Sequence, residues 1–537
     1  MGATEKAYER RWWILAVLCL SLVVITLDNT ILNVALPTLV EKLHATNSQL
    51  QWIVDGYTLV FAGLLLTAGS LGDRLGRKGA LQIGLTIFGV GSALSALATS
   101  PTQLIITRCL MGIGGAFIMP ATLSILTNVF PPEERGRAIG VWAGISGIGV
   151  AVGPLLGGYL VDHFSWGSVF TVNLPVVAIA IGAGAWIVPS SKDPDAAKLD
   201  PVGALLSIIG LVSLVFALIE APQEGWTNPK ILVAFALGFL TLSAFAGWEL
   251  RSEHPMLDVS FFKNPRFSAA STAITLVFFG MFGFSFLLTQ YLQFVLGYSP
   301  SEAGLRMMPL ALTLMVTAPL SSRFVERVGT KIIVGTGLSF VSIALFLNIG
   351  LQVTSSYGEV VWRMMFLAVG MGLVMAPATE SIMGSLPLGK AGVGSAVNDT
   401  TRQVGGALGI AIIGSVLSSV YGSKIADFLT SAGLPHSAVE GARDSLGGAL
   451  AIAGKVGGSN GAAIATAAKS AFVDALHGGA IVAAIAAALG TAVVVVWLPS
   501  HAPAPVALPT SEDADNEYSD PVLNSDHSSD PVPVATV

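Results

Sequence analysis

The chain has 537 residues, of which 53% are hydrophobic and only 11% charged, and its mean hydropathy is +0.74. Soluble domains carry roughly 25% charged residues, so this composition excludes a soluble protein with a single anchor and indicates a polytopic membrane protein. Much of the net charge of −6 comes from the C-terminal tail, so it points to no charged partner, and we expect no nucleic-acid binding. Both cysteines, Cys19 and Cys109, fall in apolar runs, which makes a disulfide framework or a zinc site implausible.

The N-terminal segment 1–11 leads into a full-length apolar run without a small-residue cleavage site, so we expect a retained first helix. Apolar stretches of about 19 or more residues, the length that crosses the hydrocarbon core as a helix, recur along the chain. They do not alternate as barrel strands do. The sequence thus predicts an all-α fold of about fourteen transmembrane helices, near 12–36, 50–70, 79–99, 102–122, 138–161, 168–189, 202–220, 230–249, 268–292, 303–322, 331–352, 360–380, 393–419 and 477–498.

Lysine and arginine gather in the N-terminal segment and in every second loop, whereas the opposite short loops hold little beyond Lys42 and Lys230. The positive-inside bias therefore places the N-terminus in the cytoplasm. Because the number of spans is even, the C-terminus is expected on the same side.

One short basic turn, between the second and third spans, stands out. Glycines in it allow two helix ends to approach closely, and Gly76 can supply a left-handed turn conformation. Asp73 can accept hydrogen bonds from amides at the start of the next helix or pair with a nearby arginine. An ordinary basic anchor loop is the alternative. The candidate residues for a conformational switch are Gly69, Gly72, Asp73, Arg74, Gly76, Arg77 and Lys78.

A second copy of this turn indicates an internal repeat. In the segment 322–331, Glu326 aligns with Asp73 and Gly329 with Gly76. Each copy is followed by an arginine and then a related Met-, Pro-, Ala- and Thr-containing stretch, at 119–122 and 375–379. Two related halves in one membrane chain are typical of transporters.

The repeat predicts the domain organisation. Spans one to six match spans nine to fourteen, which leaves an inserted pair between them. The outer segment 421–476 is rich in Ala and Gly and forms either one or two amphipathic helices or a loose loop. The expected parts are a cytoplasmic N-terminus 1–11, a six-helix half 12–189, a linker 190–201, the inserted helices 202–249, a linker 250–267, a six-helix half 268–498, and a disordered acidic tail 499–537.

Three further stretches carry a family resemblance: Leu27–Pro37, Arg108–Gly115 and Gly149–Gly158. Together with the basic turn, they resemble the major facilitator superfamily, and specifically its fourteen-span drug:proton antiporters, which include bacterial quaternary-ammonium and multidrug efflux pumps. The resemblance implies the major facilitator fold, with two extra central helices. The sequence departs from the family at Met111, where glutamine is common, and at Gly167, where arginine is frequent.

The stretch in the fifth span resembles the antiporter motif of that family. Its glycines recur every four residues, which places them on one helix face for close backbone contact, and its proline removes one helical hydrogen bond. A plain packing seam is one interpretation; the resemblance implies a seam between the halves that prevents a leak during rocking. The motif residues are Gly149, Gly153, Pro154, Gly157 and Gly158.

Ionisable residues within the spans are candidates for proton coupling, because each costs about 2.5–3.5 kcal/mol to insert. Asp28 is too short to reach the interface; a hydrogen bond to Thr30 or Asn33 is its structural alternative. The resemblance makes Arg108 part of proton coupling, against a buried counter-charge. Asp55 lies near the outer end of its span, where it is either a coupling group or merely solvated.

Substrate contacts are expected from acidic and aromatic residues. Asp399 stands one turn before Arg402, and one interpretation is that the two neutralise each other by pairing; the resemblance instead implies that an acidic residue in this region attracts cationic drugs. Glu380 is either a substrate group or a helix-end charge. Phe278 and Phe282 line a greasy cavity or serve in packing, and Asp28 is also a candidate for the cavity wall.

These features predict a monomeric, proton-coupled exporter of lipophilic, cationic drugs in a bacterial plasma membrane, whose partners are small-molecule drugs, protons and the lipid bilayer. Export of a lipid, an amino acid or an endogenous antibiotic is the alternative, and a non-transporting sensor or scaffold is a rival of another class. We expect no enzyme activity, cofactor or metal, since neither a metal-spaced His/Glu cluster nor a phosphate-binding loop is present.

Overall fold

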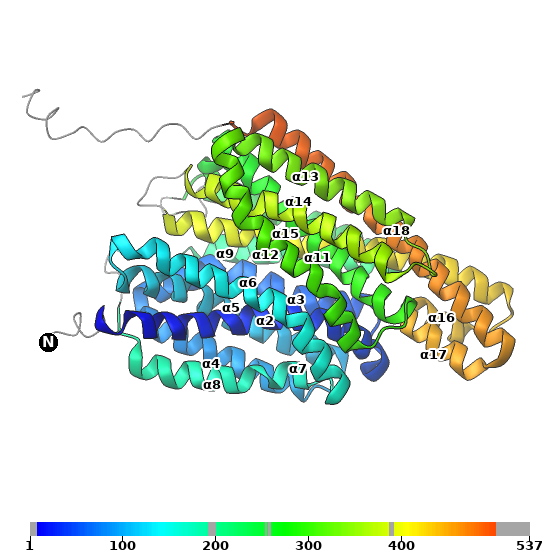
Figure 1. Ribbon diagram of the computed structural model, residues 1–537. Helices are drawn as coiled ribbons and strands as arrows, with labels where there is room; N and C mark the ends of the chain where they lie inside the picture. Colours follow the sequence, from blue (N-terminus) through cyan, green and yellow to red (C-terminus); the bar gives the residue numbers. More distant parts are fainter. Residues whose placement is uncertain (1–7, 192–199, 253–254, 256–258, 386–390, 501–537) are drawn as a thin grey trace, which may run out of the picture. The chain divides into compact units, whose positions relative to one another are not determined.

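The computed structural model describes residues 8–191, 200–252, 255, 259–385 and 391–500. These residues belong to one compact unit, Met1–Ser500. All regular elements assigned within them are helices, so the predicted all-helical fold is confirmed (Figure 1). The predicted acidic tail lies outside the described residues from residue 501 onward.

The first half of the chain supplies six predicted spans. Helices α3 and α4 both pack against α5, and α2 packs against α6. The sixth span is interrupted near residue 172, where α7 ends and α8 begins. The helices are α2 (Arg11–Leu43), α3 (Asn47–Leu75), α4 (Arg77–Ala96), α5 (Pro101–Val129), α6 (Pro132–His163), α7 (Ser168–Thr171) and α8 (Asn173–Ile187).

The second half follows the same plan. Helices α12 and α13 both pack against α14, and α11 packs against α15. The helices are α11 (Pro265–Gln290), α12 (Pro300–Val328), α13 (Thr330–Leu347), α14 (Tyr357–Met383), α15 (Ala391–Ser431), α16 (His436–Asp444), α17 (Leu446–Val456) and α18 (Gly458–Trp497), with the short elements η1 (Val259–Lys263), η2 (Tyr291–Val295) and η3 (Asn348–Gly350).

Local interactions repeat between the halves as well. In each, the second long helix begins with a reciprocal capping box, Thr46 with Gln49 in α3 and Ser299 with Glu302 in α12. The glycine that ends each of these helices has a positive φ, +124° at Gly76 and +86° at Gly329. These paired features support the internal repeat inferred from the sequence.

The residue after each of these glycines donates its backbone amide to a carbonyl beyond the last helix of the same half. The amide of Arg77 donates to the carbonyl of Ser191, just beyond α8, at 2.9 Å, and the amide of Thr330 donates to the carbonyl of Ser500, just beyond α18, at 2.9 Å. In each half, therefore, the turn between the second and third helices is tied to the chain that leaves the last helix.

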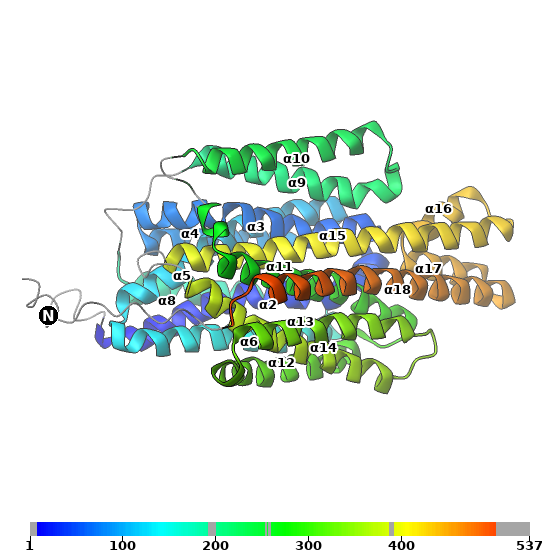
Figure 2. The same ribbon diagram turned by 90° about the horizontal axis from the view of Figure 1, so that it is seen from above.

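The inserted pair, α9 (Pro201–Glu224) and α10 (Pro229–Glu249), forms an antiparallel hairpin beside the two halves (Figure 2). Helix α9 packs against both α3 and α15, one from each half. Glu220 of α9 accepts hydrogen bonds from Ser48 Oγ at 2.8 Å and from Trp52 Nε1 at 2.9 Å, both on α3. The hairpin is thus fastened to the N-terminal half by directional bonds.

By length and composition, twelve helices of the described chain are able to cross a membrane, and thirteen when the bent α3 is included as one span. The remaining predicted span corresponds to α6, a helix of 32 residues with an internal proline at Pro154. The count of fourteen spans therefore stays a prediction.

Residues 421–476, for which the sequence left a loose loop open, are largely helical. Helices α15 and α18 extend into this segment, and α16 and α17 lie between them. The hydroxyl of Tyr421 donates to the carbonyls of Ala442 and Ser445, at 3.0 and 3.2 Å. Lys424 also forms an ion pair with Asp474 at 2.6 Å. The hydroxyl of Tyr421 thus holds the end of α16 against α15, and the ion pair joins α15 to α18, on which α17 packs.

Replacing Gly76 with Ala is expected to destabilise the protein by about 1–3 kcal/mol, because a side chain at positive φ stores backbone strain. Gly79→Ala is the matched control, since an added Cβ there meets nothing within 4 Å. Thermal unfolding in detergent should show a lower Tm for Gly76→Ala alone. Equal Tm values for the two variants would contradict a role for the turn conformation.

Candidate functional site

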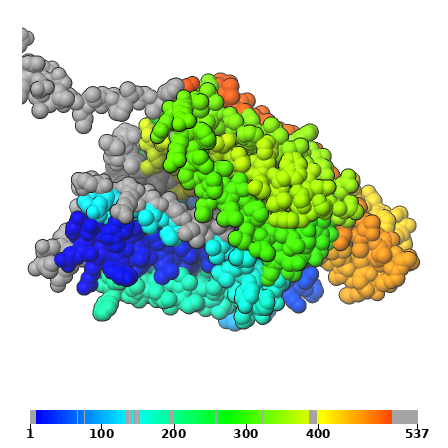
Figure 3. All heavy atoms as spheres, in the orientation of Figure 1, coloured from blue at the N-terminus to red at the C-terminus, as the bar shows by residue number. Residues whose placement is uncertain are grey.

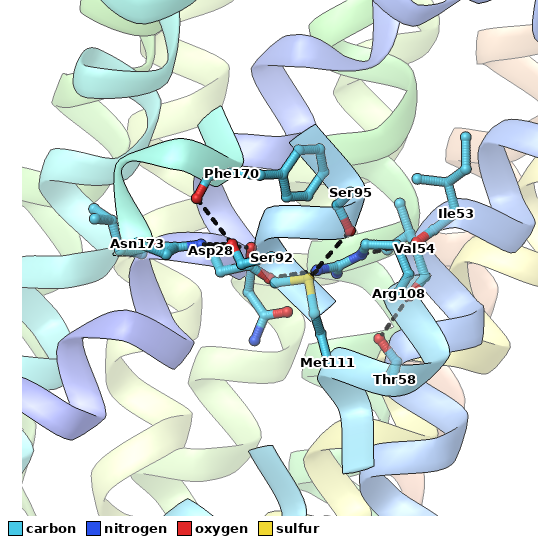
Figure 4. A network of polar contacts seen from close by, with 12 residues as sticks. Asp28, Ile53, Val54, Thr58, Ser92, Ser95, Arg108, Met111, Phe170 and Asn173 are labelled. Carbon is cyan, nitrogen blue, oxygen red and sulfur yellow. Dashed lines mark hydrogen bonds and ion pairs between the residues drawn. The ribbon is translucent and has the colours of Figure 1, made fainter. Parts of the chain in front are cut away.

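A buried ion pair lies inside the N-terminal half. Asp28 of α2 is 2% exposed and Arg108 of α5 is 0% exposed. Arg108 Nη1 donates to Asp28 Oδ2, so two residues that the sequence analysis singled out separately are direct partners (Figure 4). Removing both charges from water is costly, and only mutual attraction together with further hydrogen bonds offsets that cost.

Other groups complete the surroundings of both charges. Asn173, the first residue of α8, donates through Nδ2 to Asp28 Oδ1 at 3.2 Å. Arg108 Nε donates to the carbonyl of Ile53 at 3.1 Å, and its guanidinium lies 4.3 Å from the centroid of the Tyr57 ring. Four helices, α2, α3, α5 and α8, therefore converge on one charge pair.

The hydrogen bond of Asp28 with Thr30 or Asn33, which the sequence left open, is replaced in the structure by bonds to other helices. The hydroxyl of Thr30 bonds to backbone carbonyls, including that of Gly149 at 3.3 Å, and Asn33 donates to the carbonyl of Asn29 at 3.2 Å. Asp28 instead accepts its side-chain hydrogen bonds from Arg108 and Asn173. The carboxylate is thus bonded to groups on other helices.

Asn173 was missed by the sequence analysis. Its side chain also donates to Ser92 Oγ at 3.2 Å, and Ser92 in turn donates to the carbonyl of Phe170 at 2.8 Å. An asparagine within the apolar run 168–189 was the available signal, since a polar side chain at that depth requires partners. The carboxylate of Asp28 is thereby joined to α4 and to the interruption between α7 and α8.

Met111 occupies the position at which the resembled family often has glutamine. Its sulfur lies 3.9 Å from Arg108 Nη1 and 3.5 Å from Ser95 Oγ, and Ser95 also donates to Thr107 at 2.8 Å. A thioether is a weak acceptor. The contact of Arg108 with Met111 is therefore weak, and its strong hydrogen-bond acceptors are Asp28 and the carbonyl of Ile53.

Arg363, the counterpart of Arg108 in the second half, is bonded differently. It donates to the carbonyls of Leu347 at 3.0 Å and Glu359 at 2.6 Å. The corresponding segment of α11 carries the ring pair Phe278 and Phe282, stacked with centroids 5.9 Å apart. Both halves therefore have an arginine at this position. In the first half it pairs with a carboxylate, and in the second it bonds to backbone carbonyls.

Asp55 is fully buried on α3, so its carboxyl group is not exposed at the surface of the protein. Within the described part of the chain, neither of its carboxylate oxygens has a hydrogen-bond partner. Burying a carboxyl group without hydrogen-bond partners costs free energy. Asp55 therefore forms no part of the Asp28–Arg108 pair, although it lies on α3, the helix whose Ile53 carbonyl accepts from Arg108.

The candidates for substrate binding on α11 and α15 do come together. Arg402 lies 5.5 Å from the Phe278 ring centroid and 3.9 Å from Asp399, whose side chain is 12% exposed. Arg402 also donates to Thr379 Oγ1 on α14 at 3.0 Å. Glu380, the neighbour of that threonine, is exposed near the end of α14.

The basic turn joins four helices, α3, α4, α5 and α8. Asp73 accepts from Arg77 Nε at 2.6 Å and from Ser124 Oγ of α5 at 3.1 Å. Lys78 donates to the carbonyl of Ala185 in α8 at 2.7 Å, while Arg74 is exposed. Close packing accompanies these bonds, since a Cβ on Gly69 would lie 3.2 Å from Pro120 and one on Gly72 would lie 3.0 Å from Ala80.

The antiporter-like motif in α6 has two faces. A Cβ on Gly149 or Gly153 would overlap Thr26 or Thr30, and one on Gly157 would meet Ile31, all on α2 of the same half. A Cβ on Gly158 would instead overlap the backbone of Pro300 in α12, and Gly304 of α12 packs on the carbonyl of Pro154. In Figure 3 the cyan atoms of α6 lie directly against green atoms of the second half.

The chain matches a known family over most of its length. The model of the Major Facilitator Superfamily matches residues 18–410, which include the ion pair, the basic turn and the glycine motif. The chain belongs to the Major Facilitator Superfamily.

Curated members with similar sequences are resistance and efflux proteins. The multidrug efflux pump LfrA of Mycolicibacterium smegmatis is 35% identical over 92% of this chain and 97% of its own. The tetracenomycin C resistance and export protein of Streptomyces glaucescens is 32% identical over 91% of each chain. The methyl viologen resistance protein SmvA of Salmonella typhimurium is 34% identical over 86% of this chain and 93% of its own.

Solved structures agree on the fold. A bacterial homologue of the human lysosomal transporter Spinster, in an inward-facing conformation, matches with a TM-score of 0.65 at 19% identity, covering 91% of this chain and 98% of that one.

Among the described residues of this superfamily member, no three His, Cys, Asp or Glu side chains are grouped to hold a metal ion.

Replacing Asp73 with Ala should slow conformational exchange more than it weakens drug binding, because the turn contacts helix ends and lies outside the ion-pair region. Exchange is measured by the rate of a fluorescence change on drug addition, and binding by equilibrium titration. The matched control is Glu326→Ala in the second copy of the turn, where the side chain is exposed. Much weaker binding with normal exchange would contradict this role for Asp73.

Proposed function

We propose that this protein exports lipophilic cationic small molecules from a bacterial cell by antiport with protons. The observation that carries the proposal is the buried Asp28–Arg108 pair, a carboxylate whose charge is balanced within the spans by one arginine. Relatives named for multidrug efflux, tetracenomycin C export and methyl viologen resistance support the substrate class. The chain acts as a transporter, and we propose that protons drive the export.

In the proposed cycle, Asp28 takes a proton from the outer side and releases it inside. A proton on Asp28 removes the negative charge and with it most of the attraction to Arg108, which is strong where the local dielectric is low. Return of Arg108 to hydrogen-bond distance favours the charged carboxylate and drives the proton off. The structure has the two groups in contact, which supports its assignment to the deprotonated stage.

Alternating access requires the halves to rock about a fixed site. Contacts between them gather at one end of the bundle: Asp162 of α6 accepts from the amide of Ser301 at 2.9 Å, and Gln293 donates to the carbonyl of Val34 at 2.8 Å. With the orientation expected from the positive-inside bias, this is the outer end, and both termini are cytoplasmic. We therefore assign the structure to a state closed towards the outside.

Substrate recognition is proposed for the group on α11 and α15. The stacked Phe278 and Phe282 rings offer apolar faces to a lipophilic cation, which cation–π attraction also favours. Asp399 supplies negative charge, and its ion pair with Arg402 is long, at 3.9 Å. A cation can therefore compete with Arg402 for this carboxylate more readily than for Asp28.

Export of an antibiotic made by the same cell is the second candidate within this class, favoured by the relative from Streptomyces glaucescens. A non-transporting sensor or scaffold with the same fold is the rival of another class. Energised cells that accumulate ethidium only when a protonophore is present would support the exporter. Ethidium levels that ignore both the gene and the protonophore would support the rival.

Asp28→Asn should abolish proton-driven efflux of every substrate, because an amide cannot cycle between protonated and charged forms. The folded protein should still bind some drugs, since the amide oxygen can accept the Arg108 hydrogen bond. The measurements are drug-induced proton release from proteoliposomes and efflux against a gradient.

Glu41→Gln is the matched control for this test, because Glu41 is exposed near the end of the same helix. It should retain both proton release and efflux. Full coupled efflux by Asp28→Asn would remove Asp28 from the mechanism and leave Asp55 or Asp399 as the proton carrier.

Asp399→Asn should impair transport of dicationic drugs more than neutral ones, since a poorly screened carboxylate distinguishes substrates by charge. Arg402→Gln should instead improve transport of dicationic drugs relative to neutral ones, because it frees Asp399 from its partner. Glu380→Gln should change selectivity little, since water screens an exposed charge. Dose–response curves for matched drug pairs provide the readout, and equal losses for both drug classes in Asp399→Asn would indicate a structural pair.

A further inference from the structure

A polar pocket lies where α16, α9 and the ends of α3 and α15 meet. Its volume is about 290 Å³, and it is lined by Asn47, Pro222, Gln223, Ser418, Glu440, Arg443 and Asp444. Arg443 Nη2 is 3.5 Å from the carbonyl of Pro222, which joins the outer helix to the inserted hairpin. Two parts outside the repeat, α9 and α16, thus form much of this pocket.

Buried polar atoms continue inward from the pocket floor. Asn47 is 2% exposed, and its Oδ1 has no hydrogen-bond partner among the residues described. The same is true of Ser418 Oγ on the facing helix α15. Both residues line the pocket, so each presents an unsatisfied group to it. Buried polar atoms without protein partners are where ordered water is expected.

The next turn of α3 repeats this feature. Gln51 is 0% exposed, and within the described chain both amide atoms of its side chain are without partners. Its amide lies against Gly414 of α15, where a Cβ would come within 2.5 Å of the Gln51 Cδ. Gly414 is four residues before Ser418, so Asn47–Ser418 and Gln51–Gly414 are successive rungs between antiparallel helices.

Asp55 is one further turn along the same face of α3, since it follows Gln51 by four residues. It is fully buried, and its two oxygens are unpartnered in the part of the chain that the structure describes. The series Asn47, Gln51 and Asp55 therefore forms one polar stripe that begins at the pocket and faces α15.

The stripe ends at Asp55. One turn on, Leu59 packs with Val215 and Ile219 of α9 and with Ala407 and Ala411 of α15 in an apolar cluster. This cluster separates Asp55 from the opposite end of the bundle. Polar groups thus extend from the pocket to one buried carboxyl and stop there.

We propose that this polar stripe between α3 and α15 is a water-filled proton path, which connects the outer pocket at α16 with Asp55. The proposal rests on the proposed proton-coupled function and assigns Asp55 as a proton site supplied separately from Asp28. Protons enter at the pocket, pass along water ordered by Asn47, Ser418 and Gln51, and protonate Asp55 without crossing the substrate region.

Charges at the mouth fit this role. Burial raises the pKa of Asp444, and Glu440 raises it further, whereas Arg443 acts in the opposite direction. Asp444 is therefore able to hold a proton at a higher pH than a free carboxylate does. The titratable and polar groups beside the path are Glu220 on α9, Ser418 on α15, and Glu440, Arg443 and Asp444 at the mouth.

Gln51→Leu tests the path, because leucine has a similar size and cannot order water. The drug-driven proton flux of proteoliposomes should fall about tenfold, while drug binding stays within about twofold. Gln51→Asn should keep most of the flux. The matched control is Gln290→Leu on α11, a buried glutamine (1% exposed) whose amide bonds within its own helix at 3.1 Å; it should keep the wild-type flux.

Thiol labelling distinguishes failure of the path from failure of the transport proposal. In a background of Cys19→Ser and Cys109→Ser, a small membrane-impermeant thiol reagent added outside should modify Ser418→Cys and Gln51→Cys but not Leu59→Cys. A wild-type protein that moves no protons with drug would overturn the proposed function even if this labelling pattern is found. Wild-type flux in Gln51→Leu, or absence of labelling at both 418 and 51, would overturn the path.

Discussion

The pairing of Asp28 with Arg108 is the interaction on which the N-terminal half depends. Neither charge can be left alone in an apolar bundle, since removing one partner of a buried pair costs about 3–5 kcal/mol. Asn173 reaches this pair through the interruption between α7 and α8, and Ile53 reaches it through its carbonyl. The positions of four helices are therefore tied to the charge state of one carboxylate.

The two halves share backbone features and differ in chemistry. Capping boxes, positive-φ glycines and the amide bonds beyond them recur in both. The buried carboxylate partner belongs to the first half, while Arg363 donates to backbone carbonyls and an aromatic pair lies on α11. In the function that we propose, the first half carries the proton and the second half binds the substrate.

Much of the fold was predictable from the sequence, because long apolar runs, glycine turns and a repeated motif are local signals. Asp28 and Arg108 were recognisable for the same reason, as charges in apolar runs. Their direct contact was not, since it depends on how α2 packs beside α5. Asn173 and Gln51 were not predicted, because the role of an amide in an apolar run depends on which groups of other helices lie beside it. The same holds for the two faces of the α6 glycines, which register alone does not separate.

The attachment of α9 has a mechanical consequence. Its contacts with α3 are directional, through the two hydrogen bonds to Glu220, whereas Val215 and Ile219 meet the small residues Ala407 and Ala411 on α15. A hydrogen bond resists displacement, but a smooth apolar surface of alanines can be traversed without unpairing any polar group. The inserted hairpin is therefore held to the first half by two hydrogen bonds and to the second by one long bond, from Arg443 to the carbonyl of Pro222, and the apolar contact of α9 with α15 leaves room for sliding between them.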